Sequence, residues 1–100
     1  MREELWTLLA KVPAGRVVAY GELGRALKNP ASGYMVGRAM AACPPELPWW
    51  RVVGKSGALP IHKRDPHLAM EQQERLRAEG IDFQDNIVDM ARFGWVFDAE

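Results

Sequence analysis

Few side chains in this sequence could carry out covalent or metal chemistry. The single cysteine, Cys43, is the candidate nucleophile, but helical spacing places it beside Met40 on an inward stripe, where a buried thiol has a raised pKa and is unreactive. The two histidines, His62 and His67, have no sulfur or further imidazole at metal-ligand spacing. The sequence also lacks a serine triad and a glycine-rich phosphate loop. We therefore expect no metal, no cofactor and no enzyme activity.

A ridge with almost no side chains is expected on the outward face of the helix that contains Cys43. Gly33, Gly37 and Ala41 recur at i, i+4 and i+8, and Tyr34 and Arg38 run beside them. Such a ridge either packs against another helix or enters a nucleic-acid groove with Arg38 on phosphate. Apolar residues already supply the inward stripe of this helix: Met35, Val36, Ala39, Met40 and Cys43. We therefore favour the nucleic-acid groove.

The charges are divided unevenly along the chain, although 13 basic and 13 acidic residues cancel. Residues 1–64 hold ten basic and four acidic side chains, a net +6, whereas residues 65–100 hold three basic and nine acidic ones, a net −6. This asymmetry is compatible with a polyanion partner and equally with two halves that pair with each other. The charge pattern alone leaves both interpretations open.

Length and composition bound the class of protein. One hundred residues, 48% of them hydrophobic and 26% charged, are typical of one globular domain, which we place at residues 1–100. No apolar stretch is long enough to span a membrane, and the acidic start of the chain does not resemble a signal peptide. With one cysteine, no internal disulfide can form. We expect a cytoplasmic monomer that does not bind membranes.

Three helices are expected in the first half of the chain. The stripe of the first consists of Leu5, Leu8, Leu9 and Val12, and Pro13 with Gly15 ends it. Residues 16–19 are a short strand or an extended connector. A second helix runs from Tyr20 to Leu27, Asn29-Pro30 breaks the chain, and a third begins at Ala31 or Ser32. Two short helices with a tight turn between them indicate a helix-turn-helix.

The second half is expected to add a small β element and one more helix. Three prolines predict an extended connection over residues 44–50, and residues 51–53 and 58–59 flank a possible hairpin turn that would form a wing. Asp65-Pro66 predicts a helix start, and Gly80 predicts its end. The apolar tail after Gly80 should fold back onto the core. The fold class is therefore mainly α with a short β-hairpin wing.

The string Pro48-Trp49-Trp50-Arg51-Val52 is the most specific in the chain. Two adjacent tryptophans could simply anchor the core. The string also resembles the active-site motif Pro-Cys-His-Arg-Val of the O6-alkylguanine-DNA alkyltransferases, with Trp49 in place of the acceptor cysteine and Trp50 in place of the histidine. A tryptophan at the acceptor position is typical of the alkyltransferase-like proteins, which are related to these enzymes but do not catalyse the transfer.

The resemblance extends over nearly the whole chain. Further segments fall in the family order and at similar spacing: residues 17–23, 29–30, 36–40, 56–57, 63–65 and 77–80. It implies a winged helix-turn-helix that resembles the C-terminal domain of the alkyltransferases, inserts its recognition helix into the minor groove and flips a damaged guanine into a pocket. It also implies that the lesion is held without repair and passed to nucleotide excision repair proteins.

The resemblance assigns roles to individual residues of the lesion pocket. Tyr20 is similar to the tyrosine that pushes on the phosphate of the flipped nucleotide. Trp49 and Trp50 would line the pocket, and Arg64 resembles the lid arginine that stacks on the flipped guanine. Glu79 is similar to the glutamate that orients the histidine in the transferases. With Trp50 in place of that histidine, the proton relay is absent.

The predicted DNA-binding residues are Tyr20, Tyr34, Gly37, Arg38 and Arg51. The arginine finger of the family falls on Tyr34, which leaves open whether Tyr34 or Arg38 fills the base stack. The predicted function is binding of double-stranded DNA that contains O6-alkylguanine. Two alternatives remain: an active alkyltransferase that uses Cys43, which falls at the position of a family asparagine, and a sequence-specific transcription factor.

Overall fold

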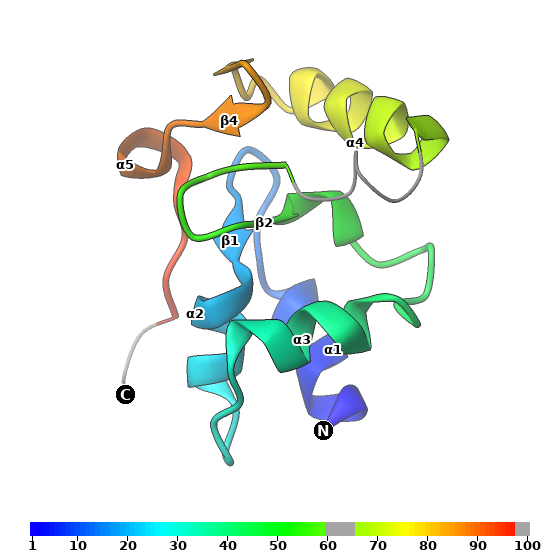
Figure 1. Cartoon of the computed structure of the whole chain (residues 1–100), viewed down its shortest axis with the longest axis vertical. Coiled ribbons are helices and arrows are strands. Elements are labelled where there is room, and N and C mark those ends of the chain that lie inside the picture. The colour runs from blue at the N-terminus through cyan, green and yellow to red at the C-terminus, as the bar shows by residue number, and fades with distance from the viewer. Residues whose placement is uncertain (60–65, 98–100) are drawn as a thin grey trace.

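A computed structural model describes residues 1–59 and 66–97, which form two groups of elements stacked along the longest axis (Figure 1). One group holds α1 (Arg2–Ala10), α2 (Tyr20–Ala26) and α3 (Gly33–Met40). The other holds α4 (Pro66–Ala78), β3 (Phe83–Gln84), β4 (Ile87–Val88) and α5 (Met90–Phe93). Between them lie β1 (Val18–Ala19), the 3₁₀ helix η1 (Trp49–Arg51) and β2 (Val52–Val53).

Each group encloses its own cluster of buried apolar side chains. The first cluster joins α1, α2 and α3: Leu5, Leu9, Val12, Val18, Leu23, Leu27, Val36, Ala39 and Val52. The second lies under α4 and the β3–β4 hairpin: Val17, Val53, Leu59, Leu76, Ile81 and Val88. Because Val17 and Val18 point into different clusters, as do Val52 and Val53, these two short segments tie the clusters together.

The helices of the first half follow the predicted periodicity. In α1, Leu5 and Leu9 are fully buried, and Val12 is buried just after the helix ends. The third helix begins after Ser32, whose hydroxyl oxygen accepts a hydrogen bond from the Met35 amide at 3.2 Å. The structure therefore confirms the helix-turn-helix and selects Ser32 as the cap of α3.

The prediction that residues 51–53 and 58–59 pair with each other as a hairpin wing is wrong. The turn exists, because the Gly54 amide donates to the Ala58 carbonyl at 2.8 Å and Gly57 has a φ of +91°. The flanking segments do not form a ladder with each other. Instead β2 pairs in parallel with β1, and Ala58 forms a bridge to Ile87. The small hairpin of the fold is β3–β4, which the sequence interpretation treated only as an apolar tail.

The connection over residues 44–50 is also not wholly extended. Trp49 and Trp50 lie in η1, where the Arg51 amide donates to the Pro48 carbonyl at 3.1 Å. Three prolines exclude an α-helix, but a single 3₁₀ turn after Pro48 needs few internal amide donors. This turn rotates the two indoles relative to each other and so determines where each one lies.

The fourth helix has the predicted limits. It begins at Pro66, while the predicted cap Asp65 lies outside the described residues. At its end the Ile81 amide donates to the Leu76 carbonyl and the Gly80 amide to the Arg77 carbonyl, both at 3.0 Å. Gly80 has a φ of +82°, so these bonds form the left-handed cap that favours glycine.

The tail returns to the core, as predicted. Asp85 and Asn86 have φ values of 54° and 60°, which produce the tight turn between β3 and β4. Beyond α5, the Trp95 amide donates to the Val17 carbonyl at 2.8 Å, and the Phe97 amide donates to the Glu22 carboxylate at 3.0 Å. The C-terminal segment thus crosses both groups of elements.

Candidate nucleic-acid interface

Close backbone contact fixes the angle between α2 and α3. A Cβ atom on Gly24 would lie 2.0 Å from the carbonyl oxygen of Ala31 and 3.1 Å from the Val36 side chain. The Ala31 amide in turn donates to the Gly24 carbonyl at 3.0 Å. Only glycine fits at this position, because any side chain would force the turn away from the helix. Gly24 therefore determines how α3 is presented to solvent.

We expect Gly24→Ala to destabilise the fold by about 2 kcal/mol, because the new methyl group overlaps backbone atoms that cannot move alone. Gly21→Ala is the matched control, since a Cβ there has nothing within 4 Å and lies in the same helix. That change should be neutral or stabilise by roughly 0.5 kcal/mol. Urea unfolding of both variants checks the packing. Equal stability of the two would contradict this arrangement of α2 and α3.

The outward face of α3 presents two long side chains and one exposed methionine. Tyr34 is 74% exposed, Arg38 is exposed and Met35 is 52% exposed. The placement of Met35 on the inward stripe was therefore wrong. The stripe is centred on Val36 and Ala39, and Met35 lies about 100° around the helix from Val36. Tyr34 and Arg38 lie on the solvent side, as predicted.

The glycine ridge of α3 lies against the start of α2. A Cβ on Gly33 would come within 3.2 Å of the Gly21 amide nitrogen, so this end of the ridge serves helix packing, the alternative that we did not favour. At Gly37 a Cβ would lie 3.9 Å from two carbons of the Tyr20 ring, which is ordinary contact. The structure thus brings Tyr20 beside Gly37, and both predicted DNA-binding residues border the exposed face of α3.

The two tryptophans of η1 contact each other edge to face. Their ring centroids are 6.0 Å apart with an interplanar angle of 87°, and both side chains are half-buried. The Trp50 ring also lies under two cations, with the guanidinium carbon of Arg75 at 4.4 Å from its centroid and that of Arg51 at 5.3 Å. Trp50 is therefore held on several sides, and its edge-to-face contact supports Trp49.

Glu79 connects three segments that are far apart in the sequence. Its carboxylate accepts hydrogen bonds from the Trp50 indole at 2.9 Å, from the Arg51 guanidinium at 2.6 to 3.1 Å, and from the Gly15 amide at 3.1 Å. The side chains of Arg51 and Glu79 are only 15% and 13% exposed. In place of a proton relay, Glu79 holds η1 against the turn after α1.

Arg51 does not present its charge to the α3 face. Its guanidinium bonds Glu79 and also donates to the Val12 carbonyl at 2.8 Å. Because these bonds occupy the guanidinium inside the chain, the structure gives no support to the prediction that Arg51 contacts DNA. The sequence separation of 28 residues between Arg51 and Glu79 gave no sign of this pairing.

The environment of Glu79 lowers its pKa. Partial burial by itself would raise the pKa of this carboxyl, but hydrogen bonds from Arg51, Trp50 and the Gly15 amide and the charge of Arg51 outweigh it. The result is a pKa below the ordinary value of 4.5, so Glu79 is ionised at neutral pH. An ionised Glu79 can hold the indole N–H of Trp50 and the guanidinium at the same time.

Cys43 has the environment of an unreactive thiol. Burial and, secondarily, the charge of Glu46 raise its pKa to about 11. Its sulfur lies 3.5 Å from the Pro44 carbonyl, to which the thiol donates a weak hydrogen bond. A thiol with such a pKa is almost entirely protonated at neutral pH and is a poor nucleophile.

Two residues that support the tryptophans were not predicted. Gln72 is buried, and its side-chain amide donates to the carbonyls of Trp50 and Val52 at 3.1 and 3.2 Å. Arg75 covers the Trp50 ring and is bonded to Glu71 at 2.8 Å. Gln72, Arg75 and Glu79 follow at i, i+3 and i+7, so helical spacing could have indicated one common face. The predicted lid residue Arg64 lies outside the described residues.

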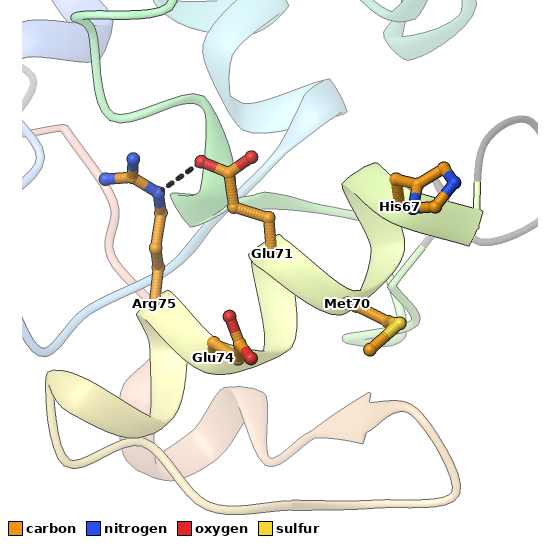
Figure 2. A pocket seen from close by; sticks show the side chains of 5 residues that line it. All are labelled: His67, Met70, Glu71, Glu74 and Arg75. Atoms are coloured by element: carbon orange, nitrogen blue, oxygen red, sulfur yellow. Dashed lines mark hydrogen bonds and ion pairs between the residues drawn. The ribbon is translucent and has the colours of Figure 1, made fainter.

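A shallow pocket of about 540 Å³ lies along α4 itself (Figure 2). Its lining comes from one helix: His67, Met70, Glu71, Glu74 and Arg75.

In the described residues, no group of three or more histidine, cysteine or acidic side chains could hold a metal ion. None of the helices described is long and apolar enough to cross a membrane.

Known proteins share both the sequence pattern and the fold. Residues 1–81 match the family model of the 6-O-methylguanine DNA methyltransferase, DNA binding domain. The chain is 34% identical over 82 residues to alkyltransferase-like protein 1 of Schizosaccharomyces pombe. This match covers 79% of this chain and 74% of that protein. It is 31% identical over 81 residues to a DNA base-flipping protein of Vibrio parahaemolyticus, with coverages of 79% and 78%.

A solved structure extends this similarity to nearly the whole fold. The crystal structure of Schizosaccharomyces pombe Atl1 in complex with damaged DNA containing O6-carboxymethylguanine matches with a TM-score of 0.81 at 28% identity. The match covers 94% of this chain and 93% of that one. The mainly helical fold class predicted from the sequence is therefore confirmed.

Proposed function

Because the chain belongs to the family of the 6-O-methylguanine DNA methyltransferase DNA-binding domain, we propose that it binds O6-alkylguanine in double-stranded DNA without removing the alkyl group. The damaged base would be flipped into a pocket bordered by tryptophan. The bound lesion would then be passed to nucleotide excision repair proteins. Relatives named for base flipping, and a similar fold seen with damaged DNA, support the first part of this proposal.

The proposal rests on the residue type at the position of the acceptor cysteine, which is tryptophan in this chain. Trp49 follows Pro48 where the resemblance puts the reactive cysteine, and an indole has no thiolate that could accept an alkyl group. Trp49 is half-buried on η1 with one edge supported by Trp50. An indole in this position offers a stacking surface and no nucleophile.

The energies of flipping and stacking are of similar size. Extruding a base costs a few kcal/mol, and least where the base pair is already weakened by an alkyl group on O6. Stacking on an aromatic side chain contributes about 1 to 3 kcal/mol for each base. An aromatic pocket can therefore hold a damaged guanine without a covalent bond, and an intact base pair resists the same displacement.

The exposed face of α3 supplies the groups that would contact the duplex. Tyr34 can enter the gap left by the flipped base, because an aromatic wedge needs no charge. Arg38 lies one turn further along and can pair with phosphate. Tyr20, which borders Gly37, is at the start of α2 and is proposed to contact the phosphate of the flipped nucleotide.

The absence of transfer is tested by the mass of the protein. After incubation with excess duplex that contains O6-methylguanine, we expect the intact mass of the chain to be unchanged, because Trp49 has no thiol and the pKa of Cys43 is raised to about 11. The Cys43→Ser variant should bind the lesion like the wild type. A stoichiometric gain of one methyl group, lost in Cys43→Ser, would establish an alkyltransferase instead.

The roles of Tyr34 and Arg38 can be separated by a base-flipping assay. With a fluorescent base analogue opposite the lesion, we expect Tyr34→Ala to reduce the flipping signal more than Arg38→Ala does, because Tyr34 fills the stack. Arg38→Ala should instead weaken binding to damaged and undamaged duplexes by a similar factor. The opposite order of effects would assign the wedge to Arg38.

A further inference from the structure

A groove lies between the β3–β4 hairpin and α5, at the end of the molecule away from α3. Its volume is about 490 Å³, and its apolar lining includes Phe83, Ile87 and Phe93. Ile87 is 48% exposed, although it is a large aliphatic side chain on a strand. Figure 1 shows β4 and α5 in the upper part of the molecule and α3 in the lower part, so a ligand in this groove need not displace DNA from α3.

The backbone around the groove is held in place before any ligand binds. The Val88 amide donates to the Gly57 carbonyl and the Leu59 amide to the Asn86 carbonyl, both at 2.9 Å. The Gln73 side-chain amide adds a hydrogen bond of 2.7 Å to the Asn86 side chain. A ligand would therefore meet a formed surface and would lose little free energy in ordering it.

The charge of the groove selects the kind of ligand. Three carboxylates line it: Asp82, Asp85 and Asp89. Two guanidinium groups lie over its aromatic rings, that of Arg92 at 4.8 Å from the Phe93 centroid and that of Arg77 at 4.6 Å from the Phe83 centroid. Asp89 also caps α5, but no salt bridge within the described part of the chain involves Asp82 or Asp85. Residues 65–100 as a whole carry a net charge of −6. The carboxylates outnumber the guanidinium groups, and those of Asp82 and Asp85 are not paired with a cation among the described residues, so the groove favours a cationic ligand over an anionic one.

We propose that this groove docks a segment of a partner protein in which lysine or arginine stands beside an aliphatic side chain. The aliphatic group would cover Ile87, and the cations would pair with Asp82 and Asp85. Apolar contact and opposite charge then act together, whereas either alone would be weak at an exposed site. The identification of this partner as a repair protein rests on the proposed function. The binding chemistry of the groove does not depend on that function.

Two synthetic peptides of equal length test the binding chemistry directly. One alternates lysine with valine, and the other alternates glutamate with valine. We expect saturable binding of the lysine peptide to the full chain in the absence of DNA, with amide resonance shifts concentrated in residues 82–93. Absence of saturable binding, equal binding of the glutamate peptide, or shifts located elsewhere would overturn the proposal.

Variants of the groove separate its two contributions. The double change Asp82→Asn with Asp85→Asn should weaken lysine-peptide binding about fivefold, since two exposed ion pairs are lost, and asparagine tolerates the positive φ at position 85. Ile87→Ser should weaken it about tenfold by removing apolar contact. Glu71→Gln with Glu74→Gln removes the same charge from α4 and should change affinity by less than about twofold.

The same groove variants also separate this inference from the proposed function. We expect them to bind a lesion-containing duplex like the wild type, because the groove lies away from α3. If the α4 control weakened peptide binding as much as the groove variants do, the docking site would be refuted while lesion binding stood. Loss of lesion binding in the groove variants would likewise contradict the separation of the two surfaces.

Discussion

Replacing Glu79 with alanine should lower the free energy of unfolding by about 3 kcal/mol. The change leaves the largely buried guanidinium of Arg51, the indole N–H of Trp50 and the Gly15 amide without the acceptor that they share. Each unsatisfied donor costs free energy because water replaces the lost carboxylate only in part. Glu74→Ala, an exposed change in α4, which ends one residue before Glu79, is the control and should shift stability by no more than about 0.5 kcal/mol.

The pH dependence of stability provides a second measurement on the same carboxylate. The pKa of Glu79 is lower in the folded chain than its ordinary value of 4.5, so its contribution is fully present above that pH and is lost as the pH falls through the lower folded pKa. Glu79→Gln should therefore be less stable than the wild type at pH 7, and the difference should shrink in acid. Urea unfolding of the variant and the wild type at pH 7 and in acid measures this difference in the free energy of unfolding. A difference that does not change with pH would contradict this role for Glu79.

Replacing Trp49 with alanine should weaken binding to a lesion-containing duplex by about 1 to 3 kcal/mol, or roughly fivefold to more than a hundredfold. The reason is the loss of the stacking surface that we propose for the flipped base. Binding to the undamaged duplex of the same sequence should change little, because no base is extruded there. The measurement is fluorescence anisotropy with both duplexes.

A matched variant guards against a purely structural effect. Trp49→Phe keeps an aromatic face and should retain most of the preference for the lesion, whereas Trp49→Ala should lose it. Circular dichroism of both variants verifies that η1 and its surroundings still fold. Equal loss on damaged and undamaged DNA in Trp49→Ala would make Trp49 an anchor of the fold and not a wall of the pocket.

Much of the helical fold could be predicted because its signals are local. The stripe of α1, the cap at Ser32, and the limits of α4 at Pro66 and Gly80 depend on residues within a few positions of each other. Hydrophobic periodicity and capping chemistry therefore sufficed for these elements. Met35 was misplaced because α3 is short, and one turn of apolar residues does not define which of two neighbouring rows is buried.

The β elements were missed because their pairing is not local. The strands β1 and β2 have two residues each and meet across more than thirty residues of sequence, so neither shows a period. The turn after Gly54 resembles a hairpin turn, but Ala58 pairs with Ile87 instead of with the strand before the turn. The true hairpin turns at Asp85-Asn86, where both residues adopt positive φ without glycine.

The sequence could nominate residues for the candidate site but could not show how they are connected. Tyr20, Tyr34 and Trp49 were identified by type and by resemblance, and the described structure puts Tyr20 beside Gly37 of α3. The bonds of Glu79 to Trp50 and Arg51 depend on how α4 packs on η1, which no spacing in the sequence encodes. That packing pairs Arg51 with Glu79 inside the chain.

The affinity of the wild-type protein for two duplexes of one sequence, with and without a single O6-methylguanine, tests the central claim most directly. If an aromatic pocket holds the flipped base, the damaged duplex should bind at least about fivefold more tightly, in line with the stacking of one base. The preference should persist when the flanking sequence is changed. Equal affinity for both duplexes, or affinity that follows the sequence and not the lesion, would contradict it.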